Sequence, residues 1–235
     1  MRSGKRPDRV FKDVAYAVLR SQLASISIPQ ERYLDNSTES TYLNLAKKEG
    51  FQPDSIVLSD GSKGHWLGPR NKDKVMVYFH AGGNLTLGVL SHLLHPHPDI
   101  SIRPKVDEHF RAAVLISPWV KFATEDSSHK RNFYTDMLPP AAAKRWSSAF
   151  LGSAPLDNYN QPVLADSSWF RGLDGLVKEV LVWGGGGEVL IDSIDDIANK
   201  LKEAHPKTEY IVQRMKTSSS WPFLAIRAKQ KELKS

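Results

Sequence analysis

One stretch decides how this chain folds, and it reads Val75-Met-Val-Tyr-Phe79-His80-Ala81-Gly82-Gly83-Asn84-Leu-Thr-Leu-Gly88. Its first five residues are apolar and include β-branched valines, which is typical of a buried strand. The glycines that follow allow a sharp turn because they carry no side chain. The next segment, residues 84–95, is predicted to be a helix that ends before Pro96. The stretch therefore predicts a strand, a tight turn and a helix.

Strands and helices alternate along the rest of the 235 residues. Another helix is expected to begin after Asn36, where Asn36-x-x-Glu39 is typical of a capping box, and to end at Gly50. This order of elements predicts an α/β protein with a mainly parallel sheet and helices on both faces. The remaining helices are predicted at residues 11–25, 139–151 and 193–204, and the strands at 55–58, 64–67, 75–79, 112–116, 180–183 and 208–212.

The amino-acid composition limits the classes of protein to which this chain can belong. With 40% hydrophobic residues in 235, one large domain can bury a real core. The chain has no cysteine, which excludes disulfides and thiol catalysis. No run approaches the ~20 apolar residues of a membrane span. The basic N-terminus has no apolar signal-peptide core behind it, so a cytoplasmic location is the expectation.

The net charge of +6 is concentrated at one end. Six basic residues and one glutamate within residues 214–235 account for +5 of it. We therefore divide the chain into a single domain, residues 1–213, and a basic tail, residues 214–235. Such a tail can touch an acidic membrane surface, although a charge run is more often a solvated end, and nucleic-acid binding is not inferred from it.

The opening stretch carries two motifs of one enzyme family. His80-Ala81-Gly82-Gly83 resembles the His-Gly-Gly-Gly loop of α/β-hydrolase esterases, in which small residues donate backbone N–H groups to an oxyanion. Ala81 to Gly88 resembles the residues after the nucleophile in the Gly-Asp-Ser-Ala-Gly-Gly elbow of the hormone-sensitive-lipase-like branch. By this match His80 stands where the serine is expected, at the junction of the two motifs.

In the family these two motifs lie roughly 70 residues apart, whereas here they share four residues. We hypothesise that the intervening segment, with at least one central strand and its crossover helix, is missing near residues 80–83. The resemblance then implies an incomplete α/β-hydrolase fold, with N-terminal helices that cap an acyl pocket. It covers about residues 10–213 and is closest to fungal steryl acetyl hydrolases. Further matching stretches are Ile116-Ser117-Pro118-Trp119-Val120, Lys144 to Gly152 and Val180 to Gly186.

The resemblance also implies site residues. The run Glu188-Val-Leu-Ile-Asp192 matches the family's acid loop, so Glu188 is the candidate acid and Asp192 the second. An alternative for both is a helix N-terminus, where acidic residues favour the positive end of the dipole. Ala81, Gly82 and Gly83 are the candidate oxyanion donors.

The family's nucleophile and base have no match. No histidine follows the strand at 208–212, and His205 precedes it at a helix end, where it is expected to interact with the dipole. Ser117 and Ser91 are the alternative candidates for the nucleophile, and a structural role is the favoured interpretation of each. His92, His95 and His97 are interpreted as residues of a helix end, with no metal or cofactor predicted.

Two classes of function follow from this resemblance. The first is a serine carboxylic-ester hydrolase, of the esterase, lipase or deacetylase type, acting on a small hydrophobic ester. The second is a catalytically inactive ligand-binding remnant, or the product of a damaged or mis-joined gene. Because nucleophile and base must meet for acyl transfer, the missing pair favours weak or absent activity.

Overall fold

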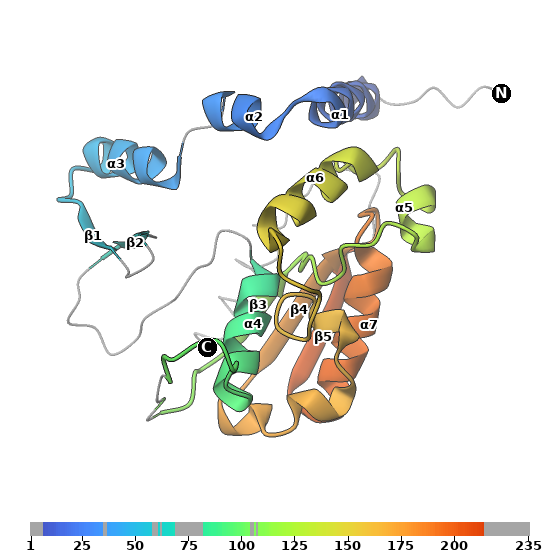
Figure 1. The fold of residues 1–235 in the computed structure, drawn as a ribbon. Coiled ribbons are helices and arrows are strands. Elements are labelled where there is room, and N and C mark those ends of the chain that lie inside the picture. The colour runs from blue at the N-terminus through green and yellow to red at the C-terminus, as the bar shows by residue number, and fades with distance from the viewer. Residues whose placement is uncertain are drawn as a thin grey trace, which may run out of the picture.

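A three-stranded parallel sheet forms the centre of the molecule (Figure 1). The computed structural model describes residues 7–34, 37–57, 61, 63–68, 82–103, 106 and 108–213, with side chains from residue 11. The strands are β3 (Ala113–Ile116), β4 (Val180–Gly185) and β5 (Thr208–Gln213), in the order β3-β4-β5. All three were predicted, as was the parallel pairing that alternating strands and helices require.

Two helices pack against this sheet through apolar stripes. Helix α7 (Ile191–Ala204) buries Ile194, Ile197 and Leu201 completely, because these positions recur on one side of a helix. Helix α4 (Gly83–Leu94) contributes Leu87 and Leu90 to the same core. The strand residues in that core are Ala113, Leu115, Val180 and Val182.

The two faces of β3 are covered unequally in the described structure. Ala113 and Leu115 face the helices and are buried, since alternate residues of a strand point to opposite sides. Val114 and Ile116 point the other way and are 50% and 45% exposed. The predicted α/β class with a mainly parallel sheet is confirmed. Helices were predicted on both faces of the sheet, and in the described residues α4 and α7 share the core with one face.

The N-terminal helices lie apart from the sheet, along the top of Figure 1. They are α1 (Pro7–Ser25), α2 (Ile28–Leu34) and α3 (Thr38–Glu49), followed by an antiparallel pair, β1 (Asp54–Val57) and β2 (Lys63–Trp66). Helix α6 (Pro140–Leu151) joins them to the rest, because Arg145 pairs with Glu31 and the Trp146 indole donates to the same carboxylate at 2.8 Å.

The start of α3 differs from the predicted capping box by one residue. Ser37 is the N-cap, and its hydroxyl accepts the backbone N–H of Ser40 at 3.1 Å. Because Ser37 is the N-cap, Ser40 and not Glu39 occupies the third helical position that the box requires. Glu39 pairs with Lys63 of β2 at 2.6 Å. Gly50 ends the helix as predicted, with φ of 73°.

Residues 152–176, where the sequence predicted no helix or strand, contain three short 3-10 helices. These are η1 (Pro162–Leu164), η2 (Ser167–Phe170) and η3 (Leu173–Gly175). Phe170 and Leu173 within them are fully buried, so this segment is part of the core. Helices α2 and α5 (Ser127–Arg131) were also missed, since five to seven residues are too few for a periodic pattern.

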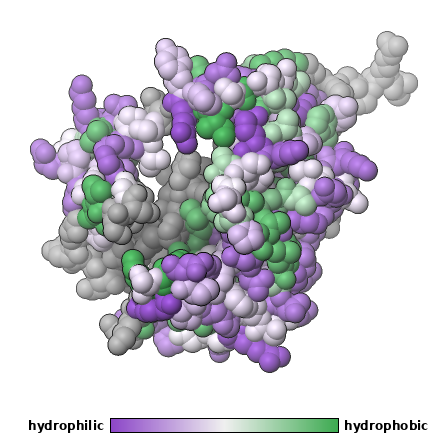
Figure 2. Space-filling view, in the orientation of Figure 1, coloured by the Kyte–Doolittle hydropathy of each residue, from purple (hydrophilic) through white to green (hydrophobic). Residues whose placement is uncertain are grey.

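Several predictions concern residues outside the described structure. The strand predicted at 75–79, the residues His80 and Ala81, and the basic tail at 214–235 all lie there. In the described part, none of the helices has the length and apolar character needed to cross a membrane. On the face seen in Figure 2, hydrophobic residues are interspersed with hydrophilic ones.

The contact between α4 and the turn after β3 predicts a steric effect. A Cβ on Gly83 would lie 2.3 Å from the Cβ of Pro118, a distance that requires the backbone to shift. We expect Gly83→Ala to lower the free energy of unfolding by about 1–3 kcal/mol, as overpacking does. Urea denaturation measures this change.

Gly175→Ala is the matched control, because no atom lies within 4 Å of its added Cβ. Its free energy of unfolding is expected to stay within about 0.5 kcal/mol of the wild type. Equal stability of the two variants would contradict the close packing of α4 on Pro118.

Candidate functional site

The candidate site lies where β3 and β4 end. In open parallel sheets, ligands bind at the carboxyl ends of the strands, because the loops that carry functional groups gather there. Ser117 directly follows β3, and residues 186–190, which we name the acid loop, join β4 to α7 (Figure 1). Ile116 pairs with Trp183 across the two strands, so the two segments leave the sheet at nearly the same level.

The Glu188 carboxylate turns back from the acid loop toward the strand ends. Its Oε1 accepts a hydrogen bond from the Ser117 hydroxyl at 2.7 Å and another from the Gly185 N–H at 2.9 Å. Its Oε2 is buried and has no hydrogen-bond partner in the described structure. Glu188 therefore presents one occupied and one open acceptor.

The surroundings make Glu188 a stronger base than an exposed glutamate. Burial raises the pKa of the Glu188 carboxyl, because the charged form loses solvation. The hydrogen bonds from Ser117 and Gly185 lower this pKa without cancelling the rise, and the nearby charge of Asp136 raises it further. A raised carboxyl pKa in a polar cluster at strand ends is typical of functional sites.

Ser117 adopts an uncommon backbone conformation. Its φ is 45°, and it is the one non-glycine residue with positive φ in the described part of the chain. Such a conformation costs about 1–2 kcal/mol for an L-residue with a Cβ. The Ser117 N–H remains bonded to the Trp183 carbonyl at 2.8 Å, so the sheet continues up to the strained residue. The strained residue is thus the one whose hydroxyl donates a hydrogen bond to Glu188.

The acid loop is held in place by the segment at residues 128–136, which begins within α5. Four polar side chains of this segment bond to backbone groups of the loop, so every residue from 186 to 189 is tethered. Asn132 donates to the Glu188 carbonyl at 2.7 Å and to Gly186 at 3.3 Å, Thr135 donates to Gly187 at 2.7 Å, Ser128 donates to Val189 at 2.6 Å, and Asp136 accepts the Val189 N–H at 2.7 Å.

Asp192, the second candidate acid, lies in the first turn of α7 and bonds elsewhere. Arg131 donates to its Oδ1 at 2.6 Å, and the Ser128 N–H donates to its Oδ2 at 2.8 Å. Burial by itself raises the pKa of Asp192, but these hydrogen bonds outweigh it and lower the pKa overall. The structure therefore brings Glu188, and not Asp192, into contact with Ser117.

The candidate oxyanion residues Gly82 and Gly83 begin α4. Gly82 is the N-cap, with φ of 60° and no side-chain cap. Gly83 lies against Pro118, the residue after Ser117, so the N-terminal end of this helix adjoins the site. The positive end of a helix dipole favours negative charge there.

None of the described histidines is hydrogen-bonded to Glu188. His205 is buried at the end of α7, where its Nε2 lies 2.9 Å from the Val177 carbonyl, in keeping with a structural helix-end role. The Ser55 hydroxyl lies 2.8 Å from Nδ1 of His65, but this exposed pair belongs to β1 and β2. Sequence reasoning did not single out that pair.

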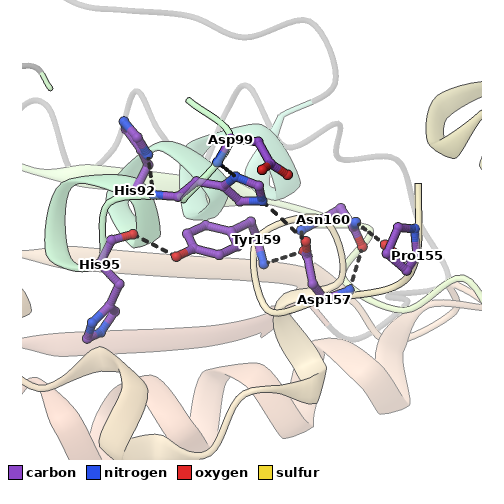
Figure 3. A network of polar contacts seen from close by, with 8 residues as sticks. His92, His95, Asp99, Pro155, Asp157, Tyr159 and Asn160 are labelled. Atoms are coloured by element: carbon purple, nitrogen blue, oxygen red, sulfur yellow. Dashed lines mark hydrogen bonds and ion pairs between the residues drawn. The ribbon is translucent and has the colours of Figure 1, made fainter. Parts of the chain in front are cut away.

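The histidines at the end of α4 form a structural network (Figure 3). The His97 imidazole lies 3.7 Å from the Asp157 carboxylate, and Tyr159 donates to the His95 carbonyl at 2.8 Å. The ring of His92 accepts the His97 N–H at 3.0 Å. These contacts tie the loop at residues 155–160 to the helix. No cluster of metal-ligating side chains occurs in the part of the chain that the structure describes.

The contact between Ser117 and Glu188 was not predicted, because 71 residues separate them. A signal was present, however. Both residues follow strands that were predicted correctly, and adjacent parallel strands bring their carboxyl ends together. What was missing was the knowledge that these two strands are neighbours.

Known proteins share this fold. The model of a family described as alpha/beta hydrolase fold matches residues 76–217. Among solved structures, an esterase from the bacterial hormone-sensitive lipase family is 25% identical, with a TM-score of 0.45, over 57% of this chain and 40% of that one. Carboxyl esterase 2 from the mycorrhizal fungus Tuber melanosporum is 18% identical, with a TM-score of 0.46, over 57% of this chain and 41% of its own.

A mutant of the esterase E40 is 26% identical over 57% of this chain and 40% of its own, with a TM-score of 0.44. The chain thus spans about 40% of the length of these esterases. No curated protein matches it significantly. Closeness to fungal steryl acetyl hydrolases stays a prediction.

The raised pKa of Glu188 predicts a dependence of stability on pH. The native state binds this proton more tightly than the unfolded state, so ionisation of Glu188 reduces stability as pH rises from the ordinary value of 4.5 through the raised pKa. Glu188→Gln removes the ionisation. The free energy of unfolding of this variant, relative to wild type, should therefore increase with pH and then level off.

Urea denaturation between pH 4 and pH 8 measures this difference. Asp192 is common to both proteins, so its opposite contribution cancels. Glu203→Gln, an exposed change on α7, is the control and should follow the wild type. Parallel curves for wild type and Glu188→Gln would show that Glu188 has an ordinary pKa.

Proposed function

Because the chain belongs to the alpha/beta hydrolase fold family, we propose that it is a carboxylic-ester hydrolase in which Glu188 is the catalytic acid. The observation that carries this proposal is the state of the Glu188 carboxyl at the end of β4. It is largely buried, one oxygen accepts the Ser117 hydroxyl, and the other is buried without a hydrogen-bond partner among the described residues. An acid in acyl transfer must accept hydrogen bonds from the groups that move the proton.

The hydrogen bonds that hold the acid loop in place support this role. A catalytic carboxylate is effective when its position is set before the substrate arrives, because no reorganisation is then needed during the reaction. Asn132 holds the Glu188 carbonyl, and Asp136 holds the next N–H. The backbone that carries the Glu188 carboxylate is therefore held at its carbonyl and at the next N–H.

The N-terminal end of α4 supports the same proposal. Ester hydrolysis develops negative charge on the carbonyl oxygen, and donors or dipoles aimed at this charge lower the barrier. Gly82 and Gly83 are the residues that match the family's oxyanion loop, and they lie beside the turn that carries Ser117. We infer a small hydrophobic ester as the substrate, as the family resemblance implies.

One observation favours a second candidate, a protein that binds esters or carboxylates without turning them over. No histidine in the described residues contacts Glu188, so the usual base of the family is missing from this carboxyl group. Without a base, binding energy can be retained while acyl transfer is lost.

Hydrolysis of nitrophenyl acetate and nitrophenyl butyrate separates the two candidates. We expect purified wild-type protein to hydrolyse them, and Glu188→Gln to lower kcat/KM by roughly 10²-fold or more, as loss of a positioned acid or base does. Glu203→Gln is the matched control and should retain the wild-type rate. Circular dichroism establishes that each variant is folded.

Folded wild-type protein without hydrolysis would exclude the esterase and leave the binding protein. Hydrolysis that persists unchanged in Glu188→Gln would remove Glu188 from the mechanism. Since burial raises the pKa of Glu188, the acidic limb of the rate profile is also expected above pH 4.5, its ordinary value.

A further inference from the structure

Ser117 has the contact that a nucleophilic serine requires. A serine hydroxyl becomes a nucleophile when a base within hydrogen-bond reach accepts its proton. The Ser117 Oγ already donates to Glu188 Oε1 at 2.7 Å, and no other described side chain donates to this carboxylate. We propose that Ser117 is the nucleophile of ester hydrolysis in this chain and that Glu188 is its direct general base. This inference rests on the function proposed above.

The backbone at Ser117 suits this role. Nucleophilic serines of this fold class sit on a sharp, strained turn after a parallel strand, which exposes the hydroxyl above the sheet. Ser117 follows β3 directly and has φ of 45°, and its side chain is half-buried. Strain of this kind persists where surrounding structure imposes it, here through the hydrogen bond from the Ser117 N–H to the Trp183 carbonyl.

The neighbouring helix supplies charge stabilisation. Attack on an ester places negative charge on the carbonyl oxygen within a few ångströms of the nucleophile. The N-terminal end of the 12-residue helix α4 packs on Pro118, and its N-cap Gly82 adjoins the Ile116 carbonyl. Three elements therefore converge on one point: the end of β3, the acid loop and the start of α4.

The reaction balances with these groups alone. The Ser117 Oγ attacks the carbonyl carbon while its proton passes to Glu188 Oε1. The tetrahedral intermediate then collapses, the bond to the alcohol oxygen breaks, and Glu188 returns the proton to the departing alcohol. In the second half, water attacks the acyl-serine ester and gives a proton to Glu188. Collapse restores the Ser117 hydroxyl with that proton and releases the carboxylic acid.

A carboxylate is a weaker base than imidazole, and the site compensates in part. Burial raises the pKa of Glu188, which brings its basicity closer to that required near neutral pH. The Gly185 N–H donates to the same Oε1 at 2.9 Å and so helps to fix its position. The proton therefore has a short, fixed path.

Labelling with a fluorophosphonate tests the proposal, since the reagent modifies serines activated by a base. The full 235-residue chain is labelled, its intact mass is measured, and the modified peptide is identified. We expect one adduct per chain, on Ser117, and none in Ser117→Ala or Glu188→Gln. Ser55→Ala is the matched control, because Ser55 also has a base at hydrogen-bond distance, His65 at 2.8 Å, but lies away from the sheet. It should be labelled as fully as wild type.

Ser117→Gly separates chemistry from folding. Glycine adopts positive φ without strain, so this variant keeps the turn and loses only the side chain. It is expected to fold at least as stably as Ser117→Ala, to take no label, and to lose about 10²-fold or more in kcat/KM for nitrophenyl butyrate.

Each contrary result rejects a particular proposal. An adduct on another serine, on Ser55 for example, or no adduct on folded wild-type protein, overturns the assignment of Ser117. If Ser117→Gly hydrolyses the ester normally while Glu188→Gln does not, the proposed esterase function is supported and the assignment of Ser117 as nucleophile is rejected. If wild-type protein hydrolyses neither nitrophenyl ester, the proposed esterase function itself is rejected.

Discussion

The parallel register between β3 and β4 is the constraint on which the site depends. Ile116 lies opposite Trp183, and the Ser117 N–H donates a hydrogen bond to the Trp183 carbonyl. This pairing sets the level at which Ser117 leaves the sheet and brings it within reach of the acid loop. A slip of one residue would turn every side chain of β3 to the other face, which would expose Leu115 and move Ser117 away from Glu188.

The helices enforce this register through close packing. Gly184 of β4 lies so near Ile191 and Ile194 that an added Cβ would come within 3.0 Å of the first. At the end of β3, α4 meets Pro118 through Gly83. Because interiors are close-packed, two such contacts leave little freedom for the strand ends between them.

The N-terminal helices reach the same loop through polar contacts. Arg20 of α1 is buried and donates to the Asp136 carbonyl at 2.8 Å, while the Asp136 carboxylate holds the Val189 N–H at 2.7 Å. The acid loop is thus joined to α1 in two steps. Buried polar groups that are satisfied in this way specify one arrangement, since breaking one bond leaves its partner unpaired.

The elements themselves were largely determined by the sequence, because apolar periodicity and glycine positions are local properties. Strands β3, β4 and β5 and helices α4, α6 and α7 were predicted within a few residues. The role of Glu188 as the acid, taken from its resemblance to a known loop, stays a prediction. Short elements such as α5 could not be predicted, and the N-cap of α3 is Ser37, one residue later than predicted, while Glu39 pairs with Lys63. Only the tertiary structure decided that Ser117 meets Glu188, since strand order and register arise from packing between segments 71 residues apart.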